Sequence, residues 1–168
     1  MKKITLTDKR KNNYYYNEAI KPLRTNIQLS GQSIKTILIT SCFPNEGKSD
    51  VVLSLAQELG SIGKKVLLLD ADIRKTAYVG RLGVEEEVRG LSQFLSGQAN
   101  INDIIYETNF ENMDIIFGGP SAPNPSGLLS ENVFQVFLKK VREYYSYILI
   151  DTPPIGTVVD AAVIGRYC

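Results

Sequence analysis

Four short and almost continuous apolar runs occur along the chain, and stretches with apolar residues at helical spacing lie between them. The runs are residues 36–40, 65–70, 113–117 and 147–151. Apolar runs without alternating polar positions are typical of strands that are buried on both faces of a parallel sheet. The pattern therefore predicts four strands of a mostly parallel sheet.

Helices are predicted between these strands, because apolar residues recur there every three or four positions. The predicted helices cover residues 18–30, 49–63, 90–97, 100–108 and 130–145. Strands that alternate with helices predict an α/β fold with three layers, doubly wound around a mostly parallel sheet. In such sheets, ligands bind beyond the carboxyl ends of the strands.

The first residues of the chain differ in composition from the rest. Residues 1–17 are polar and contain the tract NNYYYN, so they predict a flexible polar arm, and residues 18–168 form the predicted domain. Pro22 is expected in the first turn of the helix that starts at residue 18, where its missing N–H is not needed. Tyrosines 14–16 would be accessible in such an arm and are candidate phosphoryl acceptors.

The composition excludes several classes of protein. The chain of 168 residues suits one domain, and its net charge of +1 gives no reason to expect nucleic acid as a partner. Two cysteines and no histidine provide neither a disulfide framework nor zinc-ligand spacing, which favours a reducing cytoplasm. No apolar run approaches the roughly 20 residues of a transmembrane helix, and the start lacks the apolar stretch of a signal peptide.

The segment SCFPNEGKSD, residues 41–50, lies between a predicted strand and a predicted helix. Its Gly47-Lys48-Ser49 matches the second half of the phosphate-loop pattern G-x-x-x-x-G-K-[ST], although Cys42 stands at the first glycine position. Backbone N–H groups of such a loop cradle phosphates, the lysine reaches the β- and γ-phosphates, and the serine hydroxyl binds Mg²⁺. The alternative is a Gly-Lys-Ser turn that holds no ligand.

Acidic residues follow two of the predicted strands. Asp70 and Asp72 end the run VLLLDAD, and Asp151 ends the run YILID. Carboxylates beside a phosphate loop can bind Mg²⁺ or accept a proton from a hydroxyl nucleophile. Taken singly, each is equally explained as a turn or capping residue. Their occurrence in this order together with the loop favours a nucleotide site.

The segments SCFPNEGKS, VLLLDADIRK and YILIDTPP resemble the Walker A, A′ and B motifs of bacterial tyrosine kinases. These are P-loop protein kinases that control capsule and exopolysaccharide synthesis. Residues 90–97, 118–131 and 151–165 agree with the same family, so the resemblance runs from about Glu18 to the last residue. It implies a P-loop NTPase fold, an ATP-dependent protein-tyrosine autokinase activity, and ATP or ADP with Mg²⁺ as cofactors.

The resemblance also implies roles for individual residues. The catalytic residues would be Lys48, Asp70, Asp72 and Asp151, and the ligands of Mg²⁺ would be Ser49, Asp70 and Asp151. The nucleotide would be bound by Asn45, Glu46, Gly47, Lys48, Ser49 and Asp50. Asn45 stands where many relatives have glycine, and asparagine tolerates a left-handed backbone better than most residues.

Partners are implied in the same way. Glu18, Lys21 and Arg24 match the family's Glu-x-x-Arg-x-x-Arg oligomerisation motif, with lysine in place of the first arginine. Lysine lacks the planar fork of arginine, so a weaker or altered ring of subunits is expected. The other implied partners are a membrane adaptor of the chain-length-determinant type as activator, protein tyrosine substrates and a cognate tyrosine phosphatase. The adaptor would hold the protein at the inner face of the cell membrane.

Two departures from the family leave alternatives open. Asp50 replaces a threonine whose hydroxyl and N–H face the α-phosphate. A like charge at about 4–5 Å costs on the order of 3–4 kcal/mol at an effective dielectric constant near 20, so we expect weaker ATP binding than in Asp50→Thr. Relatives also continue beyond the last predicted helix with further strands and a tyrosine-rich tail, and without those strands residues 36–40 would form an exposed edge.

These departures make a degenerate nucleotide-binding regulatory module, with little kinase activity, one alternative. The other is a P-loop ATPase of the partition and cell-division type. Those ATPases carry a signature lysine five residues before the P-loop lysine, and this position holds Phe43 here.

Overall fold

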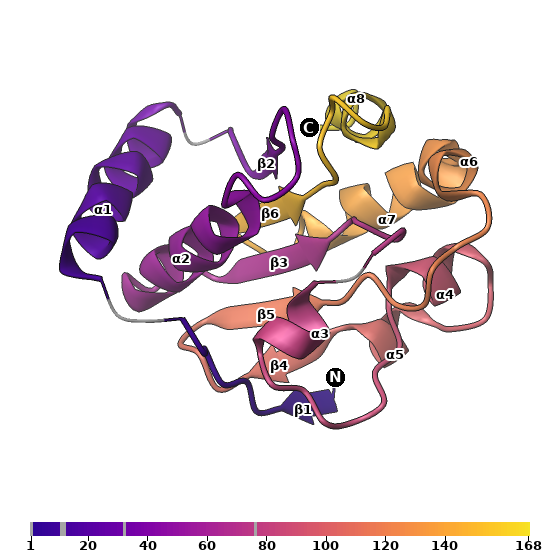
Figure 1. Ribbon diagram of the computed structural model, residues 1–168, viewed down its shortest axis with the longest axis horizontal. Coiled ribbons are helices and arrows are strands. Elements are labelled where there is room, and N and C mark those ends of the chain that lie inside the picture. Colours follow the sequence, from indigo (N-terminus) through magenta and orange to yellow (C-terminus); the bar gives the residue numbers. More distant parts are fainter. Residues whose placement is uncertain (1, 11–12, 32, 76) are drawn as a thin grey trace.

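The computed structural model describes residues 2–10, 13–31, 33–75 and 77–168. In these ranges, the strands form one six-stranded sheet with the order β1-β4-β5-β3-β6-β2 (Figure 1). The strands are β1 (Lys2–Ile4), β2 (Thr36–Ile39), β3 (Val66–Asp70), β4 (Tyr106–Thr108), β5 (Met113–Ile116) and β6 (Tyr147–Asp151). All neighbouring strands are parallel except β4 and β5, which are antiparallel.

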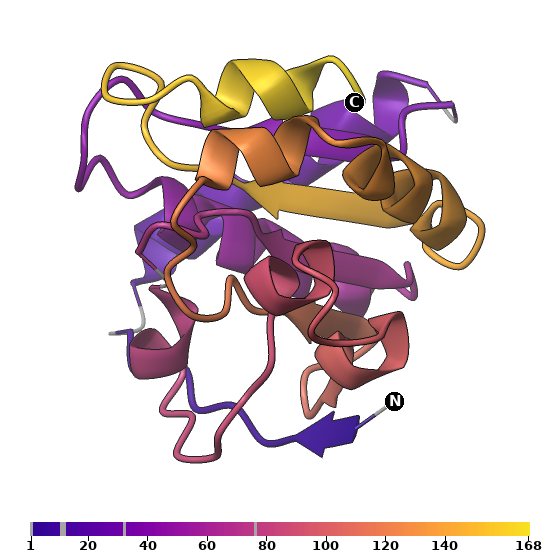
Figure 2. The ribbon, with the colours of Figure 1, turned by 90° about the vertical axis from the view of Figure 1, so that its right-hand side faces the viewer.

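Helices cover both faces of this sheet. They are α1 (Tyr14–Leu29), α2 (Lys48–Ser61), α3 (Tyr78–Arg81), α4 (Leu91–Leu95), α5 (Ile101–Ile104), α6 (Pro125–Ser130), α7 (Asn132–Val141) and α8 (Asp160–Gly165). The core on one face contains residues of α1, α2 and α3, and the core on the other contains residues of α4 to α8. Figure 2 shows α6, α7 and α8, in orange and yellow, gathered on the same side. The predicted three-layer α/β fold is thus confirmed.

The continuous apolar runs follow from this layered arrangement. In β3, Val66 and Leu68 belong to the core on the α2 face, whereas Leu67 and Leu69 belong to the core on the α7 face. Successive side chains of a strand point to opposite faces, so a strand covered on both faces needs an apolar residue at every position. The four predicted strands correspond to β2, β3, β5 and β6.

The prediction of a flexible arm over residues 1–17 was wrong for the part of it that the structure describes. Residues 2–4 form β1, which pairs with β4, and Leu6 is 3% exposed. Helix α1 already begins at Tyr14, where the N–H of Tyr16 donates to the Asn13 side chain at 3.2 Å. Apolar Ile4 and Leu6 alternate with polar residues, a pattern that suits a short strand. Residues 11–12 lie outside the described residues.

Three finer predictions also need correction. Because α1 starts four residues earlier than predicted, Pro22 lies inside the helix and not in its first turn. The segment 100–108 is not one helix, since α5 is followed directly by β4. The helix predicted over residues 130–145 is shorter, since α7 covers Asn132–Val141.

Strand β2 lies at the edge of the sheet, as expected for residues 36–40 in this chain. Within the described ranges, none of the helices combines the length and apolar character that a membrane-spanning segment requires.

Candidate functional site

The predicted phosphate loop joins β2 to α2 at the carboxyl edge of the sheet. The register of the parallel strands places Ile39 of β2 opposite Asp151 of β6, and Asp151 opposite Asp70 of β3. The loop and the ends of β3 and β6 therefore meet at one edge. The structure thus brings together the loop residues and the acids that were singled out from the sequence.

The loop has the backbone conformation that its sequence suggested. Asn45 has a φ of 64°, which confirms that this position requires a left-handed residue. Gly47 has a φ of 84° and is the last residue before α2. Within the loop, the carboxylate of Glu46 accepts a hydrogen bond from the N–H of Phe43 at 3.0 Å. Glu46 therefore closes the loop on itself.

The segment that follows β6 holds the start of the loop in place. The hydroxyl of Thr40 donates to the carbonyl of Pro153 at 3.0 Å, and the N–H of Gly156 donates to the carbonyl of Cys42 at 3.2 Å. A Cβ at Gly156 would lie 2.3 Å from that carbonyl oxygen, so a larger residue would displace the loop. The phosphate loop and the segment after β6, residues 152–156, are thus held together by hydrogen bonds.

Lys48, Ser49 and Asp151 form the centre of the site. The ammonium group of Lys48 lies 3.4 Å from Asp151 Oδ1 and donates to the Ser49 hydroxyl at 3.2 Å. Asp151 is 1% exposed, and burial raises the pKa of its carboxyl group, an effect that the positive charge of Lys48 opposes. The lysine is thus held at the base of the loop by the carboxylate.

These residues fit a nucleotide with Mg²⁺. Asp151 Oδ1 is buried and accepts no hydrogen bond from the described residues, so its negative charge is balanced by the ion pair with Lys48. Such an oxygen is an available ligand for a cation. No group of three acidic, histidine or cysteine side chains suited to a metal occurs in the described part of the chain. Mg²⁺ in nucleotide sites needs only one or two carboxylates beside phosphates and water.

The two acids at the carboxyl end of β3 differ in their surroundings. Asp70 is 1% exposed, and one of its oxygens accepts the N–H of Asp72 at 3.1 Å. Asp72 accepts the N–H groups of Arg74 and Lys75 at 3.2 and 3.0 Å with its Oδ1. Asp72 therefore stabilises the turn after β3 with one oxygen, and its other oxygen makes no hydrogen bond to a described residue.

Helix α3 adds two residues to the site that sequence reasoning missed. Tyr78 is fully buried, and its hydroxyl donates to the carbonyl of Ser49 at 3.2 Å. Burial raises the pKa of Tyr78 well above its usual value, and the charges of Asp151 and Asp70 raise it further. Arg81 forms an ion pair with Asp50 at 2.6 Å. In the sequence, these two residues were not distinguishable from a core tyrosine and a surface arginine.

The predicted oligomerisation residues lie on α1, away from the loop. Lys21 pairs with Glu18 at 2.5 Å on the same helix, and Arg24 pairs with Glu58 of α2 at 2.9 Å. Helices α1 and α2 pack side by side (Figure 1). Each of the three charged side chains is thus paired within the chain.

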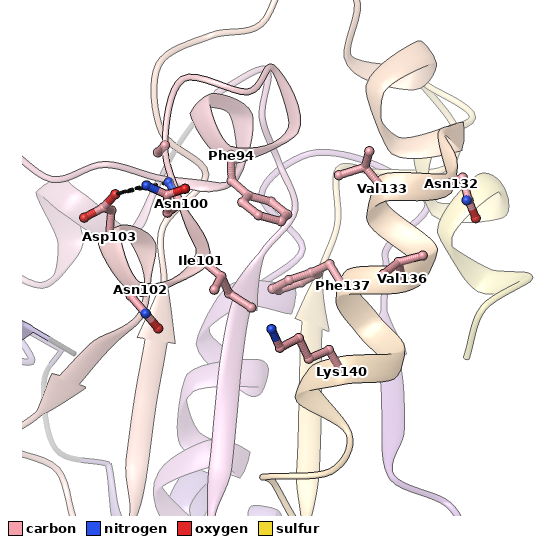
Figure 3. A pocket seen from close by; sticks show the side chains of 11 residues that line it. Phe94, Asn100, Ile101, Asn102, Asp103, Asn132, Val133, Val136, Phe137 and Lys140 are labelled. Atoms are coloured by element: carbon pink, nitrogen blue, oxygen red, sulfur yellow. Dashed lines mark hydrogen bonds between the residues drawn. The ribbon is translucent and has the colours of Figure 1, made fainter.

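A larger hollow lies at a distance from this chemistry. It measures about 830 Å³ and is bordered by α4, α5 and α7 (Figure 3). Phe94, Ile101, Val133, Val136 and Phe137 form its apolar part, and Lys140 and Asp103 lie at its margin. No residue of the phosphate loop lines it. Its size alone therefore does not identify it as the functional site.

Comparison with known proteins agrees with this geometry. Residues 34–164 match a protein family described as an AAA domain. The tyrosine-protein kinase CpsD of Streptococcus pneumoniae serotype 4 is 42% identical over 154 residues, which are 92% of this chain and 66% of that protein. CpsD of Streptococcus agalactiae serotype III is 41% identical over 163 residues, 97% of this chain and 68% of that protein. The chain thus spans about two thirds of the length of these relatives.

Solved structures give the same result. The kinase domain of the Escherichia coli tyrosine kinase ETK superposes with a TM-score of 0.84 at 33% identity, covering 90% of this chain and 60% of that one. The septum site-determining protein MinD of Pyrococcus horikoshii, solved with Mg-ADP, has a TM-score of 0.67 at 30% identity and covers 80% of this chain and 54% of that one. The tyrosine-kinase domain is therefore the better match of the two.

Proposed function

Because the chain belongs to the bacterial tyrosine-kinase family of P-loop proteins, we propose that it is the nucleotide-binding part of an ATP-dependent protein-tyrosine kinase. This kinase phosphorylates itself and regulates capsular or exopolysaccharide synthesis. The observation that carries the proposal is the meeting of Lys48 and Ser49 with the buried Asp151 oxygen at the end of the phosphate loop.

In this proposal, the backbone N–H groups of residues 45–50 surround the phosphates of ATP or ADP, and Lys48 moves from Asp151 to the β- and γ-phosphates. Ser49, Asp70 and Asp151 hold Mg²⁺. The metal, when bound, neutralises charge that develops on the phosphoryl group. The left-handed Asn45 and Gly47 support this role, because they allow the loop to curve around an anion.

The acids at the carboxyl end of β3, Asp70 and Asp72, act on the tyrosine that receives the phosphoryl group. Asp70 is the buried acid next to Asp151, and the Asp72 oxygen that makes no hydrogen bond to a described residue is the group that accepts the proton of the tyrosine hydroxyl. Phosphoryl transfer depends mainly on positioning and charge neutralisation, so one carboxylate as proton acceptor suffices.

The partners follow from the family. We propose self-association through Glu18, Lys21 and Arg24, activation by a membrane adaptor of the chain-length-determinant type, and dephosphorylation by a cognate tyrosine phosphatase. The protein then acts in the cytoplasm at the inner face of the membrane. Each charge of the α1 motif has a partner within the chain, so self-association would exchange these pairs for others. Light scattering over a concentration series decides whether the chain associates.

Two other functions remain distinguishable from this one. A partition-type ATPase is disfavoured by Phe43 at the signature lysine position and by the weaker superposition on MinD. A regulatory module without kinase activity is suggested by Asp50 beside the phosphate site.

The deciding experiment incubates the purified chain with γ-labelled ATP and Mg²⁺ and identifies the labelled amino acid. We expect phosphotyrosine, and we expect label incorporation to fall at least about 100-fold in Lys48→Met, since the lysine contacts the transferred group. Lys139→Met, at an exposed position of α7, is the matched control. Release of labelled phosphate without phosphotyrosine would indicate the partition-type ATPase, and binding without turnover would indicate the regulatory module.

A further inference from the structure

Helix α3 contacts two consecutive residues in the first turn of α2. Tyr78 donates to the carbonyl of Ser49 at 3.2 Å, and Arg81, three residues further along α3, pairs with the carboxylate of Asp50 at 2.6 Å. Residues three apart on a helix share one face. The short helix after the A′ acids thus presents one face to the start of the phosphate-loop helix.

The backbone at Asp50 is held from another direction. Arg10 donates to the carbonyl of Asp50 at 2.8 Å and to the hydroxyl of Ser54 at 2.6 Å. Arg10 also pairs with Asp8, which places this N-terminal segment firmly against α2. Two arginines therefore act at one residue. Arg10 binds its backbone, and Arg81 binds its side chain.

The ion pair, and not close packing, determines where the Asp50 carboxylate points. A hollow of about 230 Å³ borders Asp50, and Ser49, Tyr78 and Arg81 also line it. The side chain of Asp50 is 38% exposed. A carboxylate with free space beside it adopts the orientation that its charged partner favours. Arg81 is the ion-pair partner of this carboxylate among the described residues, and Arg10, which also lines the hollow, adds a longer-range attraction.

We propose that Arg81 is a positioning residue for nucleotide binding, which it supports by holding the Asp50 carboxylate on α3 and neutralising it. This inference rests on the proposed binding of ATP by the loop. Asp50 lies in the first turn of α2, whose N–H groups would face the phosphates, so an unpaired carboxylate there would repel them. The sequence-based expectation that Asp50 alone weakens ATP binding did not include Arg81, since nothing in the sequence paired them.

The test is a double-mutant cycle read by calorimetric titration with Mg·ATP. It uses the chain itself, Arg81→Ala, Asp50→Thr and the double variant Asp50→Thr with Arg81→Ala. We expect the dissociation constant to rise about tenfold in Arg81→Ala, and to lie within about threefold of the parent in the other two proteins. We also expect the deficit of Arg81→Ala to shrink at high salt, because exposed charges are screened.

Folding is controlled separately. The pair is partly exposed and contributes little to stability, so Arg81→Ala is expected to keep the thermal midpoint of the parent within a few degrees. Arg81→Lys keeps the positive charge and is expected to bind Mg·ATP within about threefold of the parent. If Arg81→Ala is unstable, Arg81→Gln takes its place as the variant without the positive charge, and Arg81→Lys stays as the charged control.

Three results would overturn the inference. Equal weakening by Arg81→Ala with and without Asp50 would mean that Arg81 acts on the nucleotide itself. Unchanged affinity in Arg81→Ala would mean that Asp50 does not repel the phosphates. Binding by Asp50→Thr more than about tenfold tighter than by the parent would mean that Arg81 does not neutralise Asp50. Absence of binding by all four proteins would instead contradict the proposed function, and the inference with it.

Discussion

At the scale of single residues, the buried carboxylates show how this chain stabilises negative charge. Asp70, Asp114, Asp151 and Asp160 are each at most 5% exposed. Asp160 is held by Arg74 at 2.8 Å and by the hydroxyl of Ser126 at 2.7 Å, and these bonds lower the pKa of its carboxyl group against the effect of burial. Asp151 Oδ1, by contrast, accepts no hydrogen bond from the described residues and lies 3.4 Å from the ammonium group of Lys48. The contrast is what is expected if the Asp151 carboxylate is kept for a ligand.

Asp114 gives a test of charge burial away from the site. It accepts a hydrogen bond from the Tyr145 hydroxyl at 2.7 Å, and burial raises the pKa of its carboxyl group. The folded state therefore binds more protons than the unfolded state above about pH 4, so the stability contributed below that pH is lost as the pH rises through the raised pKa. Asparagine keeps an acceptor for Tyr145 and carries no charge.

We accordingly expect Asp114→Asn to be more stable than the parent at pH 8, and we expect the parent to lose stability between pH 4 and pH 8 through this carboxyl group, a loss that the variant lacks. Urea unfolding at the two pH values measures this difference. Parallel pH dependence in the two proteins would show that Asp114 titrates normally in the folded state.

Single residues were predictable from the sequence where a motif and a strand end coincide. Lys48, Ser49, Asp70 and Asp151 fall at the ends of parallel strands or directly after the loop, so their meeting follows from the strand order. The pair of Asp50 and Arg81 was not predictable, because it joins residues 31 positions apart through the packing of a four-residue helix. A helix that short gives no periodic signal.

At the scale of elements, the segment before α1, residues 2–10, connects the phosphate-loop helix α2 to the rest of the domain. Strand β1 pairs with β4, the N–H of Thr7 donates to the carbonyl of Leu82 at 2.9 Å, and Arg10 reaches α2. The segment therefore links the far edge of the sheet, α3 and α2. It was missed as structure because strands of three residues are too short to show alternation reliably.

Removal of the Arg10 side chain is expected to destabilise the protein by about 1–3 kcal/mol. Asp8, the Asp50 carbonyl and Ser54 would each lose a charged hydrogen-bond donor in a partly buried position. Urea unfolding of Arg10→Ala measures the loss. Lys9→Ala is the matched control, because Lys9 is exposed and is expected to contribute less than about 0.5 kcal/mol. Equal stability of the two variants would show that the contacts of Arg10 with α2 do not stabilise the protein.

At the scale of the whole molecule, the order of the strands determines where the chemistry lies. Strand β6 is inserted between β2 and β3, so the loop after β2 and the acids of β3 and β6 share one edge of the sheet. The three-layer fold and this edge were predictable from the apolar runs and the motifs. The position of β1 and β4 beyond β5 was not, because nothing in their short sequences specifies a partner strand.

The most direct test of the proposed nucleotide site is calorimetric titration with ATP, with and without Mg²⁺, of both the parent chain and Asp151→Asn. This variant is isosteric and removes the buried charge that we assign to the cation. We predict that the parent binds ATP saturably and that its affinity falls at least about tenfold without Mg²⁺. We predict that Asp151→Asn binds ATP with the affinity of the Mg²⁺-free parent, whether or not Mg²⁺ is present. Mg²⁺-dependent binding of equal strength in both proteins would contradict the assignment of Asp151, and no binding by the parent would contradict the nucleotide site itself.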